Sequence, residues 1–438
     1  MEARYRTMQA RWGEGGIWRN WGFIFQMGEG SPLHLHHNTD EFQGFVHEAE
    51  EHLRAQRPPL ERADGAFGGH SGSFRLLPEI QTWDASGKAE SALVNEIEAN
   101  VLGLVQMSPR DEAEDDLCVF SGTANRPLAQ AVAHRLGLPL GAMAIDRFPD
   151  TEVFVQIDEM VRKRDVYVIQ PCSAPVNEHL MELLLVIDAL RRASAAQITA
   201  ILPYYPYARQ ERMARGREAI SARVVANMLE AAGVARVIYV DIHAEAIQGF
   251  FNVPVDWLQA YPTFARYFLN QRFVRDAVVV SPDVGRARLA GRFAQALGVP
   301  LVVMQKRRGA AGSVETTHVV GDVEGKIPIL IDDIMASGSA LTQVPELFRH
   351  GARPEVHLAI THPVLLPSAL ARLDAEWLAE LVVADTVLVP PPKQHPKLQV
   401  LSVAPMLAYA IRGIHRGTSI SPLWRPDAPQ ELGLYEEL

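Results

Sequence analysis

Two adjacent carboxylates follow an apolar run in the second half of this 438-residue chain, and a loop of small residues follows them. The run 327–331 leads into Asp332 and Asp333, and then into Ala336, Ser337, Gly338, Ser339 and Ala340, which open a predicted helix. A buried strand that ends in carboxylates places them at the carboxyl edge of a sheet, where open α/β folds bind ligands. Small residues let backbone N–H groups approach a phosphate. The segment predicts a site for a phosphorylated ligand, with turn-capping aspartates in a tight connection as the simpler interpretation.

Two further predicted strands end in residues that could bind a metal ion. Asp241, His243 and Glu245 follow one buried strand, and Asp283 follows the strand predicted at 278–281. Magnesium with a nucleotide prefers oxygen ligands and retained waters, which suits Asp283, while His243 could bind the metal or a phosphate-bound water. We therefore predict His243 and Asp283 as metal-site residues, although a histidine at a strand end is commonly a hydrogen-bonded structural residue.

Two basic segments would bring positive charge to the same edge. Residues 204–217 place Arg209, Arg212, Arg215 and Arg217 within nine residues after the strand predicted at 198–203. Lys306-Arg307-Arg308 follows the strand predicted at 301–305. Phosphoryl transfer needs alignment and cationic groups that neutralise charge on the transferring oxygens. The pattern favours a polyphosphate site over a solvated charge run, which is the usual alternative.

The elements that must position these residues alternate short β-branched runs with longer amphipathic segments from about residue 117 onward. This alternation is typical of βαβ units around a parallel sheet. The predicted strands are 117–121, 166–171, 198–203, 237–241, 278–281, 301–305, 327–332, 356–361 and 381–384. The predicted helices are 126–136, 177–193, 219–232, 286–297, 339–350 and 404–415. The pattern predicts an α/β fold with mainly parallel sheets.

Two α/β halves are predicted, because the region 253–262 contains Pro254 and Pro262 and separates stretches of similar length and alternation. We place the halves at 117–259 and 260–424, after an N-terminal extension of unknown fold at 1–116 and before a tail at 425–438. The extension contains a possible metal cluster of His34, His36, His37, Asp40 and Glu41. Its spacing matches no standard site, so a solvated His-rich loop is the preferred interpretation.

Bulk properties restrict the partners. The net charge of −10 and the absence of a long basic stripe argue against nucleic-acid binding. The N-terminus lacks the apolar core of a signal peptide, and no run reaches the ~18 uninterrupted apolar residues of a membrane span, which predicts a cytoplasmic protein without a membrane partner. Cys118 and Cys172 are predicted to be buried thiols.

Residues from about 117 to 424 resemble the ribose-phosphate diphosphokinases, also called phosphoribosyl diphosphate synthetases. The most specific match is DIHAEAIQGFFNVPVD at 241–256. Others are SGTANRPLAQAVA at 121–133, DRFPDTEVFVQI at 146–157, the stretch 180–212, VVSPDVG at 279–285, QKRR at 305–308 and SISPL at 419–423. The resemblance implies two tandem phosphoribosyltransferase-like domains of type I, with the ATP side in the first half and the ribose 5-phosphate side in the second.

The resemblance also implies a reaction. The C1 hydroxyl of ribose 5-phosphate would attack the β-phosphorus of Mg²⁺-bound ATP. The products would be AMP and 5-phospho-α-D-ribose 1-diphosphate, which feeds nucleotide biosynthesis. A neighbouring subunit completes the ATP site in this family, so a homo-oligomer is implied, with a dimer as building block and often a hexamer.

Matching motif positions imply the site residues. ATP would be bound by Phe148, Asp150, Glu152, Arg209, Gln210 and His243, and the metal by His243 and Asp283. Lys306, Arg308 and Arg209 would be catalytic, stabilising the transferring phosphates. Ribose 5-phosphate would be bound by Asp332, Asp333, Ala336, Ser337, Gly338, Ser339 and Ala340.

Two departures from the family pattern concern the predicted site. Where the family commonly reads Asp-Thr-Gly-Gly-Thr, this chain has residues 336–340, which lose a carboxylate and a hydroxyl. Arg286 stands where the family usually has a second glycine, and adds bulk and charge near the metal.

Three alternatives stay open at this point. They are a non-catalytic regulatory homologue, a diphosphokinase acting on a modified ribose 5-phosphate, and a phosphoribosyltransferase that uses a base. The last does not account for the arginine-rich segment. Regulation by anions is a further option, because Arg162, Ser194, Ser419 and Ser421 resemble positions that bind phosphate or ADP in some members.

Overall fold

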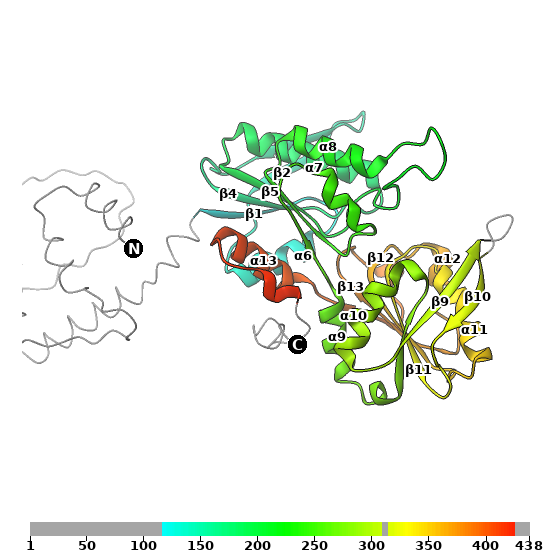
Figure 1. Ribbon diagram of the computed structural model, residues 1–438. Helices are drawn as coiled ribbons and strands as arrows, with labels where there is room; N and C mark the ends of the chain where they lie inside the picture. Colours follow the sequence, from blue (N-terminus) through cyan, green and yellow to red (C-terminus); the bar gives the residue numbers. More distant parts are fainter. Residues whose placement is uncertain (1–115, 309–313, 425–438) are drawn as a thin grey trace, which may run out of the picture. The chain divides into compact units, whose positions relative to one another are not determined.

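The computed structural model describes residues 116–308 and 314–424, with the backbone alone at 306–308 and 314–317. It contains two sheets in which nearly all neighbouring strands are parallel, with helices packed against them (Figure 1). The predicted fold class is therefore confirmed. The predictions for residues 1–115, including the histidine cluster, and for the tail at 425–438 fall outside the described residues.

The first sheet has five parallel strands in the order β1-β4-β5-β6-β7. Its strands are β1 (Leu117–Ser121), β4 (Asp165–Ile169), β5 (Gln197–Leu202), β6 (Arg236–Val240) and β7 (Val255–Leu258). Its helices are α6 (Arg126–Leu136), α7 (Val176–Arg192) and α8 (Ser221–Ala232). A separate antiparallel hairpin is formed by β2 (Met143–Arg147) and β3 (Val153–Ile157). The helices α7 and α8 cover one face of the sheet, where Leu183 and Val225 share a core with Val168.

The second sheet has seven strands in the order β10-β9-β8-β11-β12-β13-β14, and β10 alone runs antiparallel to its neighbour. Its strands are β8 (Ala277–Ser281), β9 (Leu301–Arg308), β10 (Val314–Val320), β11 (Ile327–Met335), β12 (Val356–Pro363), β13 (Leu378–Ala384) and β14 (Leu398–Leu401). Its helices are α9 (Tyr261–Leu269), α10 (Ala287–Leu297), α11 (Val344–Arg349) and α12 (Pro367–Leu370). The strands β8, β11 and β12 are consecutive neighbours, so their carboxyl ends lie side by side.

One hydrophobic core joins residues of both sheets. It contains Val119 of β1 and Ile238 of β6 as well as Val279 of β8 and Ile331 of β11. The last long helix, α13 (Ala404–His415), contributes Leu407 to this core and packs against α6 of the first half (Figure 1). The C-terminal segment of the second half thus returns to the first half, and the proposed boundary at 259/260 stays a prediction.

Most predicted elements are present, with ends shifted by a few residues, and α6 and α13 have the predicted bounds. The helix predicted at 339–350 is wrong in part, because residues Ser339–Gln343 form a 3-10 turn before α11. Pro345 near the start of α11 has no N–H for a bond to the preceding turn, which explains the interruption. The predictions missed β2, β3, β7, β10, β14, α9 and α12. Cys118 and Cys172 are free and buried, as predicted.

None of the helices in the described part of the chain is long and apolar enough to cross a membrane.

Candidate functional site

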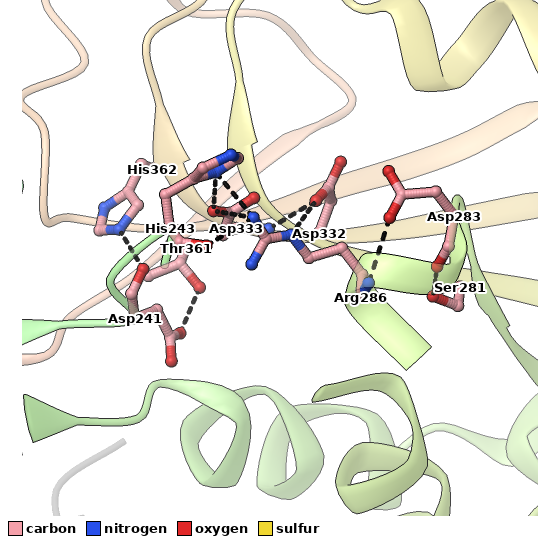
Figure 2. Close-up of polar contacts among 9 residues, drawn as sticks. All are labelled: Asp241, His243, Ser281, Asp283, Arg286, Asp332, Asp333, Thr361 and His362. Carbon is pink, nitrogen blue, oxygen red and sulfur yellow. Dashed lines mark hydrogen bonds and ion pairs between the residues drawn. The ribbon is translucent and has the colours of Figure 1, made fainter. Parts of the chain in front are cut away.

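Polar side chains gather at the carboxyl ends of four strands, one from the first sheet and three from the second (Figure 2). We call them the strand-end cluster. Its residues are Asp241 and His243 after β6, Ser281, Asp283 and Arg286 at and after β8, Asp332 and Asp333 in β11, and Thr361 and His362 in β12. Strands of a parallel sheet place their carboxyl ends at one edge, and such edges are the usual ligand sites of α/β folds. The predicted grouping of His243 with Asp332 and Asp333 is present.

Asp241 anchors the segment after β6 to β12. Its Oδ2 atom accepts hydrogen bonds from the hydroxyl of Thr361 at 2.6 Å and from the N–H of Ala260 at 3.1 Å. Its backbone φ of +38° turns the chain sharply after the strand. Burial raises the pKa of this carboxyl to about 6, although both hydrogen bonds favour the ionised form.

His362 extends this contact through a buried polar network. Its Nε2 lies 3.2 Å from the backbone oxygen of Asp241, and its Nδ1 lies 2.9 Å from the hydroxyl of Thr386. Its ring also packs on Tyr204, with ring centroids 5.0 Å apart. Burial lowers the pKa of His362 to about 4, so the ring is neutral at physiological pH.

Thr361 and His362 were not predicted as site residues. A signal for them was available, because both are polar and both follow the apolar run Leu358–Ile360 near the end of the strand.

The guanidinium of Arg286 contacts His243 and both paired aspartates (Figure 2). Its Nη2 is 3.1 Å from Asp333 Oδ2, and its Nε is 3.7 Å from Asp332 Oδ1. The same Nη2 donates to the backbone oxygen of His243 at 2.9 Å. His243 Nδ1 lies 2.7 Å from Asp333 Oδ2 and 2.7 Å from Arg286 Nη2. A protonated Nδ1 donates to the carboxylate, and an unprotonated one accepts from the arginine, so the tautomer decides which bond forms.

The two aspartates of β11 have opposite ionisation tendencies. Burial and the negative charge of Asp333 raise the pKa of Asp332 well above its usual range. Burial also opposes ionisation of Asp333, but the hydrogen bond from His243 and the charge of Arg286 outweigh it and hold its pKa below the usual range. When the pKa values of two neighbouring carboxyl groups differ in this way, the ionised group can accept a hydrogen bond and the protonated group can donate one.

Asp283 shapes the turn after β8 rather than joining the centre of the cluster directly. Its Oδ1 accepts from the N–H of Arg286 at 3.1 Å, and Ser281 Oγ donates to its backbone oxygen at 2.7 Å. Asp283 therefore caps the short 3-10 turn Val284–Arg286 and directs Arg286 toward the cluster.

The 336–340 loop follows the paired aspartates directly. Gly338 has a φ of +74°, and a Cβ there would lie 3.2 Å from Ala369 Cα, so glycine suits both the conformation and the space. The guanidinium of Arg372 donates to the backbone oxygen of Ser337 at 2.9 Å, and Ser368 Oγ donates to the same oxygen at 3.3 Å. No pattern in the sequence indicated Arg372, which lies after α12 and 35 residues from its partner.

The arginine loop, residues 204–217, begins at the cluster and continues into solvent. Arg209 and Gln210 are exposed, and Gln210 Oε1 accepts from Ser221 Oγ at 2.7 Å at the start of α8. Burial raises the pKa of the Tyr204 hydroxyl, the charge of Arg209 opposes the shift, and that of Asp333 adds to it. Tyr204 thus lies within electrostatic reach of both the loop and the paired aspartates.

The other predicted residues lie on separate elements. Phe148, Asp150 and Glu152 belong to the tip of the β2–β3 hairpin, where Phe148 is 50% exposed and packs edge-on against Phe154. Lys306 and Arg308 lie within the last three residues of β9. The structure does not describe their side chains.

A magnesium ion held by the protein alone does not fit the centre of the cluster. Within residues 116–308 and 314–424, no three His, Cys, Asp or Glu side chains are grouped so that they could hold a metal ion. The guanidinium of Arg286 already contacts His243 and Asp333. Magnesium bound with a nucleotide needs only one or two protein carboxylates, since phosphates and waters complete its shell. Asp283, which is partly exposed, fits that arrangement.

Two family models match the chain. One, described as the N-terminal domain of ribose phosphate pyrophosphokinase, matches residues 117–233. The other, described as the phosphoribosyl synthetase-associated domain, matches residues 311–425. Together they include β1 to α8 and most of the second sheet.

Full-length relatives cover the region between these matches as well. The ribose-phosphate pyrophosphokinase of Nostoc sp. is 45% identical over 310 residues, which are 70% of this chain and 94% of the relative. The chloroplastic ribose-phosphate pyrophosphokinase 2 of Oryza sativa is 43% identical over 316 residues, 72% of this chain and 79% of the relative. A solved structure, the phosphoribosylpyrophosphate synthetase of Mycobacterium smegmatis, is 44% identical with a TM-score of 0.65, and the match covers 69% of this chain and 99% of that one.

Proposed function

The chain belongs to the ribose-phosphate pyrophosphokinase family, and we propose that it transfers the diphosphate group of ATP to the C1 hydroxyl of ribose 5-phosphate. The observation that carries this proposal is that the match extends over nearly the whole length of two bacterial relatives, 94% of one and 98% of the other. Both halves of the enzyme are therefore represented. The products are 5-phospho-α-D-ribose 1-diphosphate and AMP.

Ribose 5-phosphate binds, in this proposal, at the carboxyl end of β11. Backbone N–H groups of Ala336, Ser337, Gly338, Ser339 and Ala340 hold its phosphate. Arg372 and Ser368 support this role, because they fix the carbonyl of Ser337 and so hold the loop in one conformation. Asp332 and Asp333 bind the ribose hydroxyl groups, with the ionised Asp333 accepting their hydrogen bonds.

ATP binds between the arginine loop and a neighbouring subunit. Arg209 and Gln210 contact the phosphates from the loop, and His243 faces them from the end of β6. Phe148, Asp150 and Glu152 of a second copy contact the adenine. An exposed aromatic side chain at a hairpin tip supports this assignment, because stacking on a base would cover it. The proposal implies a homodimer or a larger assembly.

Lys306 and Arg308, together with Arg209, stabilise charge on the transferring phosphates. Their position supports this role, because β9 runs parallel to β8 with Val303 opposite Ser281, so Lys306 and Arg308 lie beyond the carboxyl end of β8. Cationic groups of this kind commonly contribute several powers of ten to a phosphoryl transfer rate.

Magnesium bound with ATP would neutralise charge on the phosphate oxygens. We propose Asp283 and the partly exposed ring of His243 as the protein groups that face it. Holding the ring of His243 in place is then the role of Asp333, whose Oδ2 lies 2.7 Å from Nδ1.

A non-catalytic regulatory homologue is the second candidate. The observation that favours it is the guanidinium of Arg286, which lies among the proposed ligand groups.

The test is product formation by the full-length protein with Mg²⁺, ATP and ribose 5-phosphate, followed by chromatography of AMP and the sugar diphosphate. Lys306→Ala should lose both products. Lys326→Ala is the matched control, because Lys326 precedes β11 at the end opposite to Asp332. AMP that forms equally slowly with and without the sugar would exclude ribose 5-phosphate as the acceptor. Absence of both products would favour the regulatory homologue.

A further inference from the structure

Arg286 is held so that its side chain crosses the cluster. The carboxylate of Asp283 fixes its backbone N–H, and the guanidinium then reaches His243, Asp332 and Asp333. The side chain is 16% exposed, and that of Asp333 is 4% exposed. A pair this well covered is screened little by salt.

The guanidinium contacts oxygen and nitrogen atoms of Asp333 and His243 that, together with waters, could otherwise bind a divalent cation. Nη2 lies within hydrogen-bond distance of a carboxylate oxygen of Asp333, an imidazole nitrogen of His243 and a backbone oxygen of His243. These are the kinds of donor atom that metal ions bind in proteins. A guanidinium keeps its charge at every physiological pH, so it would repel a second cation placed a few ångström away.

Asp332 and Asp333 without this cation would form an acidic pair in partly buried surroundings. Two neighbouring carboxylates at a strand end attract divalent cations, because the ion relieves their mutual repulsion. In this chain Arg286 provides that relief instead. The backbone N–H of Asp333, which donates to Asp332 Oδ1 at 2.9 Å, fixes the orientation of one of the two side chains.

We propose that Arg286 is a built-in cation that replaces a protein-bound divalent ion at the Asp332–Asp333 pair. It holds the pair in charge balance and excludes free Mg²⁺ or Mn²⁺ from it. Divalent metal then enters the site only with the phosphates of a nucleotide. This last clause rests on the proposed function, whereas exclusion of the free ion does not.

A purely structural ion pair is the competing interpretation. It predicts that loss of Arg286 lowers stability, since an unpaired buried carboxylate is costly, but it predicts no new metal site. The two interpretations therefore differ in what the apo protein binds after the arginine is removed.

The experiment titrates Mn²⁺ into full-length protein without nucleotide or sugar and measures free Mn²⁺ by electron paramagnetic resonance. Arg286→Gln and Arg286→Gly should each gain one site per chain that binds Mn²⁺ about 100-fold more tightly than the wild-type cluster, from the removal of one charge at contact distance. Arg286→Lys keeps a cation and should gain none. Adding Asp333→Asn to Arg286→Gln should abolish the new site.

Arg288→Gln is the matched control. Arg288 is two residues further along and pairs with Glu245 at the surface, where its side chain is 64% exposed. It removes the same charge without opening the cluster, so Mn²⁺ binding should stay as in the wild type. Sites elsewhere in the chain are common to all variants and cancel in the comparison.

Equal Mn²⁺ binding by the wild type and Arg286→Gln would overturn the proposal, and so would a new site that persists after Asp333→Asn. Thermal unfolding of each variant shows whether it is folded. If Arg286→Gly is not, the pair Arg286→Gln and Arg286→Lys still decides the question. No substrate is present, so this outcome is independent of whether the chain is a diphosphokinase.

Discussion

The hydrogen bond between Thr361 and Asp241 gives the sharpest prediction about stability. Thr361 lies at the end of β12 in the second sheet, and Asp241 follows β6 in the first. The Oγ1–Oδ2 distance is 2.6 Å, and the two residues are 1% and 7% exposed. Thr361→Val removes the hydroxyl at nearly constant volume and leaves the carboxylate with one fewer donor.

The expected loss follows from the charge and the burial of the acceptor. A hydrogen bond to a charged group contributes about 1.5–3 kcal/mol to stability. Ala260 still donates to the same oxygen, so part of the solvation of the carboxylate is retained. We expect the free energy of unfolding to fall by about 2 kcal/mol at neutral pH, where Asp241 is mostly ionised.

Urea unfolding followed by circular dichroism measures this difference. Thr342→Val is the control, because the Thr342 hydroxyl donates at 2.7 Å to the backbone oxygen of Ser339 on an exposed turn, and its loss should change stability by less than about 0.5 kcal/mol. A double-mutant cycle with Asp241→Asn isolates the pair. A loss for Thr361→Val no larger than that of the control, or no coupling in the cycle, would refute the reasoning.

Three further predictions concern other parts of the structure. Burial raises the pKa of Asp385 to about 6, above its unfolded value, so its ionisation costs stability progressively as pH rises from about 4 to about 6. Over that interval the free energy of unfolding of Asp385→Asn, measured in urea, should rise relative to that of the wild type by up to about 3 kcal/mol. A difference that does not depend on pH would count against this prediction. Arg372→Ala should raise the KM for ribose 5-phosphate about tenfold with little change in the KM for ATP, because the 336–340 loop loses the contact at Ser337. Equal changes in both constants would contradict this role. Phe148→Ala should raise the KM for ATP about tenfold or more. Its stability to urea should stay unchanged, because the ring is half exposed in the free protein. An unchanged KM would show that Phe148 does not contact the adenine.

Local patterns in the sequence predicted the sheet architecture and part of the site for a simple reason. Buried parallel strands are short apolar runs, and the polar residues that follow them share one edge. This rule was sufficient for Asp332, Asp333 and His243. The same rule also indicates Thr361 and His362, which lie near the end of β12.

Features that depend on long-range packing could not be predicted in this way. The strands β7 and β14 have four residues each and are only partly buried, so they carry little hydrophobic signal. The return of α13 to α6 joins residues as far apart as Arg412 and Arg135, which are separated by 277 positions, and a single sequence gives no evidence for such a contact. The direction of the Arg286 side chain is likewise set by the turn that Asp283 caps, and the sequence alone showed only that a charge had replaced a glycine.

The identity of the transferred group is the central feature of the proposed function. Phosphorus NMR of one reaction with Mg²⁺, ATP, ribose 5-phosphate and full-length protein follows every phosphorus atom at once. We expect the ATP signals to be replaced in equal amounts by those of AMP and of a diphosphate attached to C1 of ribose 5-phosphate. Formation of ADP or free phosphate in their place, or ATP that persists unchanged, would contradict it.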